Sequence, residues 1–214
     1  MKKLLFEFGD WMTRIGEKRN IRVLIYNPVT WLRFLISAWR NGKAFASALK
    51  FHHPELKSCV DIGAGAGGYV RACRKAGFEA TGFEYSAAGR FLAKLQSVQL
   101  NRFDCGDVKF RPNVRADMAF SIEVAEHLPE ELADSFVECI AKCSDLVFFT
   151  AAQPNQPGQG HINCQPPDYW RKKFESHGFI HLEEQSLQFS ETWNARGFKG
   201  FASRNLQIFR RSGQ

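Results

Sequence analysis

Residues 58–68 read SCVDIGAGAGG, a short apolar stretch that carries one acid, Asp61, and runs directly into glycines. The stretch 58–62 is typical of a buried β-strand, and glycines at 63, 65 and 67 permit a tight turn and close approach of the main chain to a ligand. A helix expected at 67–76 would present its N-terminal N–H groups there. The spacing is GxGxG rather than GxGxxG, so it fits NAD poorly.

From residue 57 onward, strand-like stretches alternate with helical patterns, which is typical of βαβ units and a parallel sheet. The last forty residues predict two antiparallel strands near 180–189 and 198–210. We therefore expect an α/β fold, with a doubly wound, Rossmann-like, seven-stranded sheet that is mostly parallel and has an antiparallel C-terminal hairpin. Further strands are expected at 79–83, 100–105, 118–122 and 145–150, and further helices at 86–97, 129–142 and 169–177.

The formal net charge of +7 is concentrated in the first fifty of the 214 residues. Residues 1–50 contain ten Lys or Arg and three acids, whereas residues 51–214 contain 19 of each. We expect 1–50 to be a basic helical extension or cap, broken at Asn27-Pro28, and 51–214 to be the main domain. The extension fits a cap over a ligand cleft, a surface for peripheral membrane contact, or a platform for nucleic-acid phosphates. The cap is the simplest interpretation because most basic helix faces are solvated.

The six cysteines are scattered and form no Cys-x-x-Cys pair, which indicates reduced, mostly buried thiols. No stretch approaches the roughly 18 to 20 uninterrupted apolar residues of a membrane span. The apolar run that follows Met1-Lys2-Lys3 is too short for a secretion signal. We therefore expect a cytoplasmic protein.

Four motifs extend along the neutral segment: VDIGAGAGG at 60–68, GFEYS at 82–86, CGDV at 105–108 and DMAFSIEVAEHL at 117–128. In their order and placement they resemble the first four motifs of the class I S-adenosylmethionine-dependent methyltransferases. The resemblance covers roughly residues 55–212. It implies S-adenosyl-L-methionine as the cofactor, and it is nearer to uncharacterised bacterial enzymes that act on small molecules.

The resemblance assigns the cofactor-binding residues. Asp61 would orient the amino-acid part of the cofactor, and Glu84, which ends the second expected strand, would hold the ribose hydroxyls. Asp107 and Val108 would contact the adenine. The remaining expected contacts are the main chain of Gly63, Ala64, Gly65 and Gly67, together with Tyr85, Ser121 and Glu123.

A candidate chemical centre follows the fourth expected strand. Glu123, Glu126 and His127 in EVAEH lie at i, i+3 and i+4, so a helix starting there would put all three on one face. His161, in the loop QPNQPGQGHINCQPP at 153–167, would lie at the same rim of the sheet. Two carboxylates and two imidazoles suit Mg²⁺ or Mn²⁺. The set resembles that of small-RNA 3′-terminal 2′-O-methyltransferases, and EVAEH also resembles ubiquinone-biosynthesis O-methyltransferases.

A metal-free interpretation stays open. His161 would then be a general base, His127 would bond a loop carbonyl, and Glu123 would line the methionine pocket, which makes these three the candidate catalytic residues. We expect an enzyme that methylates an oxygen of a small or sugar-like molecule. The alternatives are a metal-assisted RNA 2′-O-methyltransferase and a non-catalytic cofactor-binding or membrane-associated partner protein. The sequence does not predict the oligomeric state.

Overall fold

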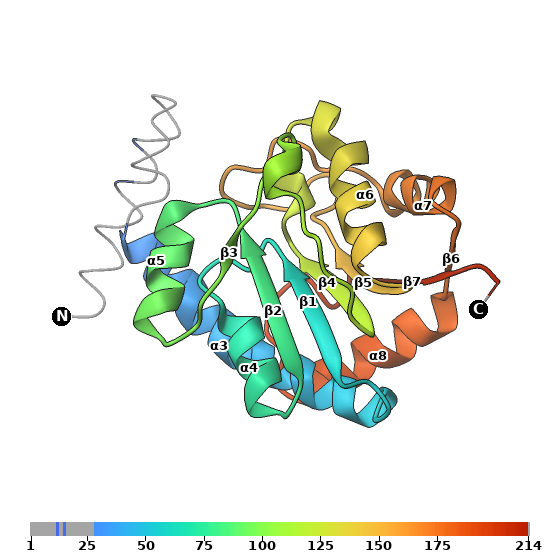
Figure 1. Ribbon diagram of the computed structural model, residues 1–214, viewed down its shortest axis with the longest axis horizontal. Coiled ribbons are helices and arrows are strands. Elements are labelled where there is room, and N and C mark those ends of the chain that lie inside the picture. Colours follow the sequence, from blue (N-terminus) through green and yellow to red (C-terminus); the bar gives the residue numbers. More distant parts are fainter. Residues whose placement is uncertain (1–11, 13–14, 16–27, 214) are drawn as a thin grey trace.

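A computed structural model describes residues 12, 15 and 28–213 of the chain (Figure 1). Its described part forms a seven-stranded sheet in the order β3-β2-β1-β4-β5-β7-β6. β1 to β5 are all parallel to one another, whereas β7 runs antiparallel to both β5 and β6. The strands are β1 Ser58–Ile62, β2 Glu79–Glu84, β3 Asn101–Arg102, β4 Met118–Ile122, β5 Leu146–Thr150, β6 Phe179–His181 and β7 Gln207–Arg211.

Helices cover both faces of the sheet, as Figure 1 shows. One face packs against α3, α4 and α8, and the other against α6 and α7. Side chains alternate between the two faces along each strand: on β5, Phe148 lies in the first core and Phe149 in the second. The α-helices are α3 Pro28–His52, α4 Gly68–Lys75, α5 Ala87–Leu95, α6 Ala133–Cys143, α7 Pro167–Ser176 and α8 Glu183–Ala195; short 3₁₀ helices are η1 Val108–Phe110, η2 Ala125–His127 and η3 Glu130–Leu132.

The predicted fold class is confirmed, with changes at the third strand and near the C-terminus. β3 is only two residues long because the chain turns at Asp104, whose carboxylate accepts a hydrogen bond from the Gly106 N–H. The strand predicted at 180–189 is wrong beyond His181: residues 183–195 form α8. The strand predicted at 198–210 begins only at Gln207. Phe189 and Trp193 lie four residues apart on this helix and are both buried, so helical spacing determines the structure here.

The second half of α3 is part of the core. Phe45 is fully buried, and its ring centre lies 5.0 Å from that of Phe120 and 5.2 Å from that of Trp193. The Asn41 side chain also joins α3 to the loop after α8, since it donates to the Lys199 carbonyl and accepts from the Lys199 N–H. The predicted boundary at residue 50 therefore falls near the end of a well-packed helix, and the division into extension and main domain remains a prediction. Residues 1–27, apart from Met12 and Ile15, lie outside the described part.

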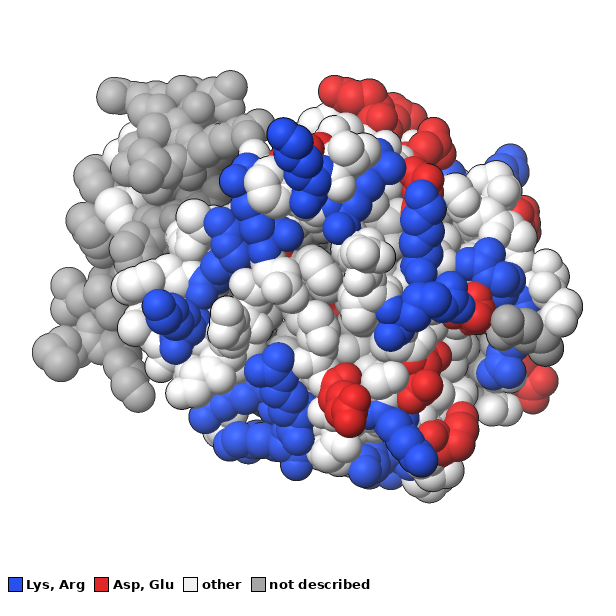
Figure 2. All heavy atoms as spheres, viewed as in Figure 1, with Lys and Arg blue, Asp and Glu red and all other residues white. Residues whose placement is uncertain are grey.

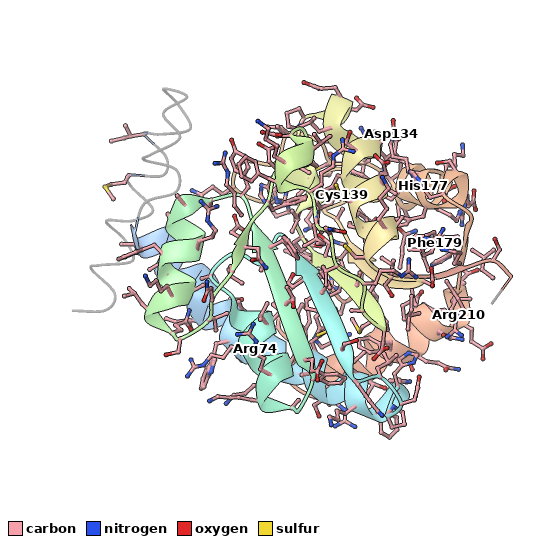
Figure 3. All side chains as sticks on the ribbon, viewed as in Figure 1. Arg74, Asp134, Cys139, His177, Phe179 and Arg210 are labelled. Carbon is pink, nitrogen blue, oxygen red and sulfur yellow. The ribbon has the colours of Figure 1, made fainter. Side chains whose placement is uncertain are left out.

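Two other predictions concern burial and the membrane. Five of the six cysteines are buried free thiols and Cys164 is half-buried, as predicted. Cys139 lies on α6 in the second core (Figure 3). None of the described helices is both long and apolar enough to cross a membrane.

The last glycine of the 58–68 stretch serves helix packing. α3 crosses the start of α4, and a Cβ added to Gly68 would lie 2.6 Å from the Cβ and 2.8 Å from the carbonyl carbon of Ala38. We expect Gly68→Ala to lower the free energy of unfolding by roughly 1–3 kcal/mol. The main chain of Ala38 would have to shift to make room for the new methyl group, and such a shift is energetically costly. Urea unfolding measures this. Gly106→Ala is the control, since its Cβ would meet nothing closer than 3.4 Å. Equal losses in the two variants would contradict the packing role.

Candidate active site

Three acids lie at the carboxyl ends of neighbouring parallel strands. Asp61 is the fourth residue of β1, Glu84 ends β2, and Glu123 follows β4 directly. β1 lies between β2 and β4, so the strand order reverses at this point. In open α/β sheets ligands bind in the crevice outside the carboxyl ends of the strands at such a reversal. The topology therefore brings the predicted cofactor residues to the expected edge.

The turn after β1 has a main chain that only glycine adopts readily. Gly63 has φ +86° and Gly65 has φ +55°. A Cβ on Gly63 would lie 2.5 Å from a methyl group of Val124, whereas a Cβ on Gly65 would meet no atom within 4 Å. The main chain at Gly65 thus borders open space, which suits close approach by a ligand.

The carboxylates of Asp61 and Glu84 are both buried beside this turn. Glu84 accepts hydrogen bonds from the N–H groups of Gly65 (2.7 Å) and Ser86 (2.6 Å). Burial raises the pKa of Glu84, and these two bonds lower it in part. Burial and then the charge of Glu84 raise the pKa of Asp61 well above its ordinary value. No described residue donates a hydrogen bond to the Asp61 carboxylate, so this acid fits a cationic ligand group, such as the ammonium of an amino-acid moiety.

The predicted adenine contacts lie at the rim. Asp107 is half-buried, and its carboxylate accepts from the Lys109 N–H. Val108 and Tyr85 leave 72% and 66% of their surfaces exposed, so both side chains are open to contact with a planar ligand. Ser121 is placed differently from expectation. It is fully buried and its hydroxyl donates to the Ile62 carbonyl (2.8 Å), so it supports the end of β1.

Glu123 is not on a helix face with Glu126 and His127, so that expectation is wrong. Its φ of +54° turns the chain before the short 3₁₀ helix η2, and its N–H donates to the Thr150 hydroxyl. The Glu123 carboxylate points to two amides: Gln156 donates to it at 2.7 Å and Asn205 at 3.1 Å.

The partners of Glu123 were not predicted from the sequence. Asn205 also donates to the Gln156 side-chain oxygen at 2.8 Å, which closes a three-residue network. Tyr69, in the first turn of α4, lies near the same acids: burial and then the charges of Asp61 and Glu123 raise its pKa well above the ordinary value. The position of Tyr69 directly after the glycines was a usable signal. Asn205 lies far away in the sequence, and no sequence pattern indicated its role.

The structure does bring Glu126, His127 and His161 together. One potential metal-binding atom from each lies within 4.8 Å of the others. Oε1 of Glu126 is 3.9 Å from Nε2 of His161, and the two imidazole centres are 5.0 Å apart. The N–H groups of Ile162 and Asn163 both donate to the Glu126 carbonyl, so the loop after β5 is fixed onto η2.

Burial dominates the ionisation of this cluster. It raises the pKa of Glu126 to about 8, with a smaller contribution from the charge of Glu123. Burial also lowers the pKa of His127, which the Gly160 carbonyl partly offsets. The lowered pKa favours the neutral His127 imidazole, which has a lone pair on one ring nitrogen.

On the side of the molecule that Figure 2 shows, the charges of the described residues do not form one basic face. Figure 2 shows Lys and Arg side chains in separate groups across the visible side, with Asp and Glu interspersed. This agrees with the neutral balance of residues 51–214. Extended nucleic-acid surfaces carry clustered Lys and Arg along one face.

Comparison with known proteins places this site in context. A sequence profile described as a methyltransferase domain matches residues 31–200. No curated protein matches the chain in sequence.

Solved structures show the same fold. A TehB-like S-adenosylmethionine-dependent methyltransferase from Corynebacterium glutamicum has a TM-score of 0.62 at 15% identity, covering 87% of this chain and 100% of that chain. The sugar N-methyltransferase KedS8 from Streptoalloteichus sp. has 0.59 at 14%, covering 80% and 86%. CalS10, an amino pentose methyltransferase from Micromonospora echinaspora, has 0.57 at 13%, covering 81% and 92%. At these identities the likeness shows the fold alone.

Proposed function

The chain belongs to the class I S-adenosylmethionine-dependent methyltransferases, and we propose that it methylates a hydroxyl oxygen of a small, sugar-like molecule. The proposal uses the two groups of residues at the carboxyl edge of the sheet. Asp61, Glu84 and the glycine turn would bind the cofactor. Glu126, His127 and His161 would hold and activate the acceptor.

The cofactor residues fit their expected ligand in charge and in shape. The unpartnered Asp61 carboxylate would accept from the ammonium group, and the main chain at Gly65 leaves room beside it. Glu84 would accept from the ribose hydroxyls while its bonds to Gly65 and Ser86 hold the turn in place. When bound, S-adenosylmethionine would supply the methyl group: its methyl C–S bond would break as the new C–O bond forms, and the products would be S-adenosylhomocysteine, a methyl ether and the released hydroxyl proton.

The single observation that carries the choice of oxygen is the cluster of the buried Glu126 with the half-buried His127 and His161. A neutral amine already has a free lone pair, whereas a hydroxyl must lose its proton as the C–O bond forms. Two imidazoles and a carboxylate can promote that loss. A sugar-like acceptor is supported by the structural likeness to KedS8, a sugar N-methyltransferase, and to CalS10, an amino pentose methyltransferase. Because KedS8 is an N-methyltransferase, N-methylation is the main competing outcome.

Methyl transfer from ¹³C-methyl-labelled cofactor tests the proposal. The full chain would be incubated separately with neutral sugars and related polyols, with amino sugars, and with short RNAs. We expect labelled methyl ethers of the hydroxyl compounds, which carbon NMR separates from methylamines. Label found only on amines or only on RNA would contradict the proposed acceptor.

A further inference from the structure

The carboxylate of Glu126 lacks hydrogen-bond partners of the kind that Glu84 and Glu123 have. Glu84 accepts from two N–H groups and Glu123 from two amides. Glu126 is fully buried, and neither of its oxygens makes a well-formed hydrogen bond within the described residues. The N–H groups of Glu126 itself and of Ala152 lie near enough to lower its pKa, but burial outweighs them. A buried acid in this condition is costly unless a positive group or a proton compensates it. The groups that face it are His161, His127, Glu123 and the Cys164 thiol, and no described Lys or Arg pairs with it.

The two imidazoles are oriented so that each leaves one ring nitrogen available to a ligand. Nδ1 of His127 lies 3.1 Å from the Gly160 carbonyl, and Nδ1 of His161 lies 3.3 Å from the Gln156 carbonyl. Each Nδ1 can thus donate its proton to a main-chain oxygen, which leaves the lone pair on Nε2. Metal-binding histidines nearly always donate their second nitrogen in this manner, because the bond fixes both tautomer and ring orientation.

The loop that carries His161 is shaped around the ring. A Cβ on Gly158 would lie 2.0 Å from Nε2 of His161, so only glycine leaves the imidazole in place. The bonds from Ile162 and Asn163 to the Glu126 carbonyl hold the loop against η2 on the other side of the histidine. The three side chains therefore converge through fixed main-chain positions.

From this geometry we propose that Glu126, His127 and His161 bind one divalent transition-metal ion and that Glu123 is not a ligand. Two imidazoles and one carboxylate favour Mn²⁺, Fe²⁺ or Zn²⁺ over Mg²⁺, which prefers oxygen ligands. Three protein ligands leave coordination positions open. A hydroxyl oxygen bound there would lose its proton more readily, a consequence that rests on the proposed methyl transfer.

Metal content tests the site directly. The full chain would be stripped with EDTA and titrated separately with Mn²⁺, Zn²⁺ and Mg²⁺, with calorimetry for affinity and mass spectrometry for stoichiometry. We expect about one Mn²⁺ or Zn²⁺ per chain and at least about 10-fold weaker binding of Mg²⁺, since that ion prefers an all-oxygen site. Failure of the wild type to bind either Mn²⁺ or Zn²⁺ would overturn the proposal.

Variants identify the ligands. Glu126→Gln and His161→Asn should each weaken metal binding by about 100-fold or more, because loss of even an outer partner of a ligand costs roughly 10–100-fold. Gly158→Ala should weaken it as well by displacing the His161 ring. Matched controls are Glu131→Gln on the exposed η3 and His177→Asn at the end of α7 (Figure 3), both of which should bind normally.

Glu123→Gln discriminates the three-ligand site from a four-ligand one. We expect it to retain about one metal per chain, because its carboxylate already accepts from Gln156 and Asn205. Unchanged affinity in Glu126→Gln, with the fold verified by circular dichroism, would reject the site. If EDTA-treated protein that holds no metal still transfers methyl groups, the metal has no role in the reaction, and the proposed methyl transfer stands without it. A metal-binding chain that transfers no methyl group would reject the proposed function and leave the metal site standing.

Discussion

Glu84→Ala is expected to weaken S-adenosylhomocysteine binding on the order of 100-fold. Two charge-assisted hydrogen bonds to the ribose would be lost, at roughly 1.5 kcal/mol or more each, and about 3 kcal/mol corresponds to this factor in Kd. The substitution also frees the N–H groups of Gly65 and Ser86, so the turn that lines the cofactor loses its anchor. Isothermal titration calorimetry measures the change.

Glu79→Ala is the matched control, because Glu79 is an exposed acid at the opposite end of the same strand. It should bind the ligand as the wild type does. Glu84→Gln should fall between the two, since it keeps one acceptor oxygen for the turn or the ribose. Wild-type affinity in a folded Glu84→Ala variant would show that the ribose is held elsewhere.

His161→Asn is expected to slow methyl transfer by about 10²- to 10⁴-fold, with cofactor affinity changed little. This range is typical for loss of a group that promotes proton removal in the reaction. The separation of effects follows from geometry: His161 contacts Glu126, Gln156 and Cys164, and none of these is bonded to Asp61 or Glu84. Single-turnover transfer of labelled methyl gives the rate, and calorimetry gives the affinity.

His177→Asn serves as the control for replacing a histidine, because His177 caps α7 and makes no contact with the cluster. It should retain the wild-type rate. If His161→Asn loses cofactor binding and rate by the same factor, the histidine holds the loop rather than the acceptor. If its rate is unchanged, the cluster has no part in activating the acceptor.

The architecture could be predicted where local pattern and packing agree. β1 and β4 begin and end where the sequence predicts, because both are short, apolar and bounded by turn residues. The strand prediction failed after His181. The alternation of apolar and polar residues there suggested a strand, but burial of Phe189 and Trp193 against Phe45 favours a helix. Tertiary packing decided this case, and a single sequence does not contain that information directly.

The site was predictable in part for a similar reason. Asp61 and Glu84 follow from strand ends, since carboxyl ends of adjacent parallel strands meet at one edge. The i, i+3, i+4 argument for Glu123 assumed an α-helix, but its left-handed main chain directs the carboxylate to Gln156 and Asn205 instead. His161 approaches Glu126 only through a loop conformation that Gly158 permits. The periodicity of a sequence does not predict contacts that loops make or contacts between segments distant in the chain.

Calorimetric titration of the wild-type chain with S-adenosylmethionine and with S-adenosylhomocysteine tests the central claim most directly. We expect each ligand to bind with a stoichiometry of about one per chain and the two to compete for one site. We also expect Glu84→Ala to abolish most of this affinity and Glu79→Ala to leave it unchanged. A folded wild-type protein that binds neither ligand would contradict the assignment of Asp61, Glu84 and the glycine turn as a cofactor site.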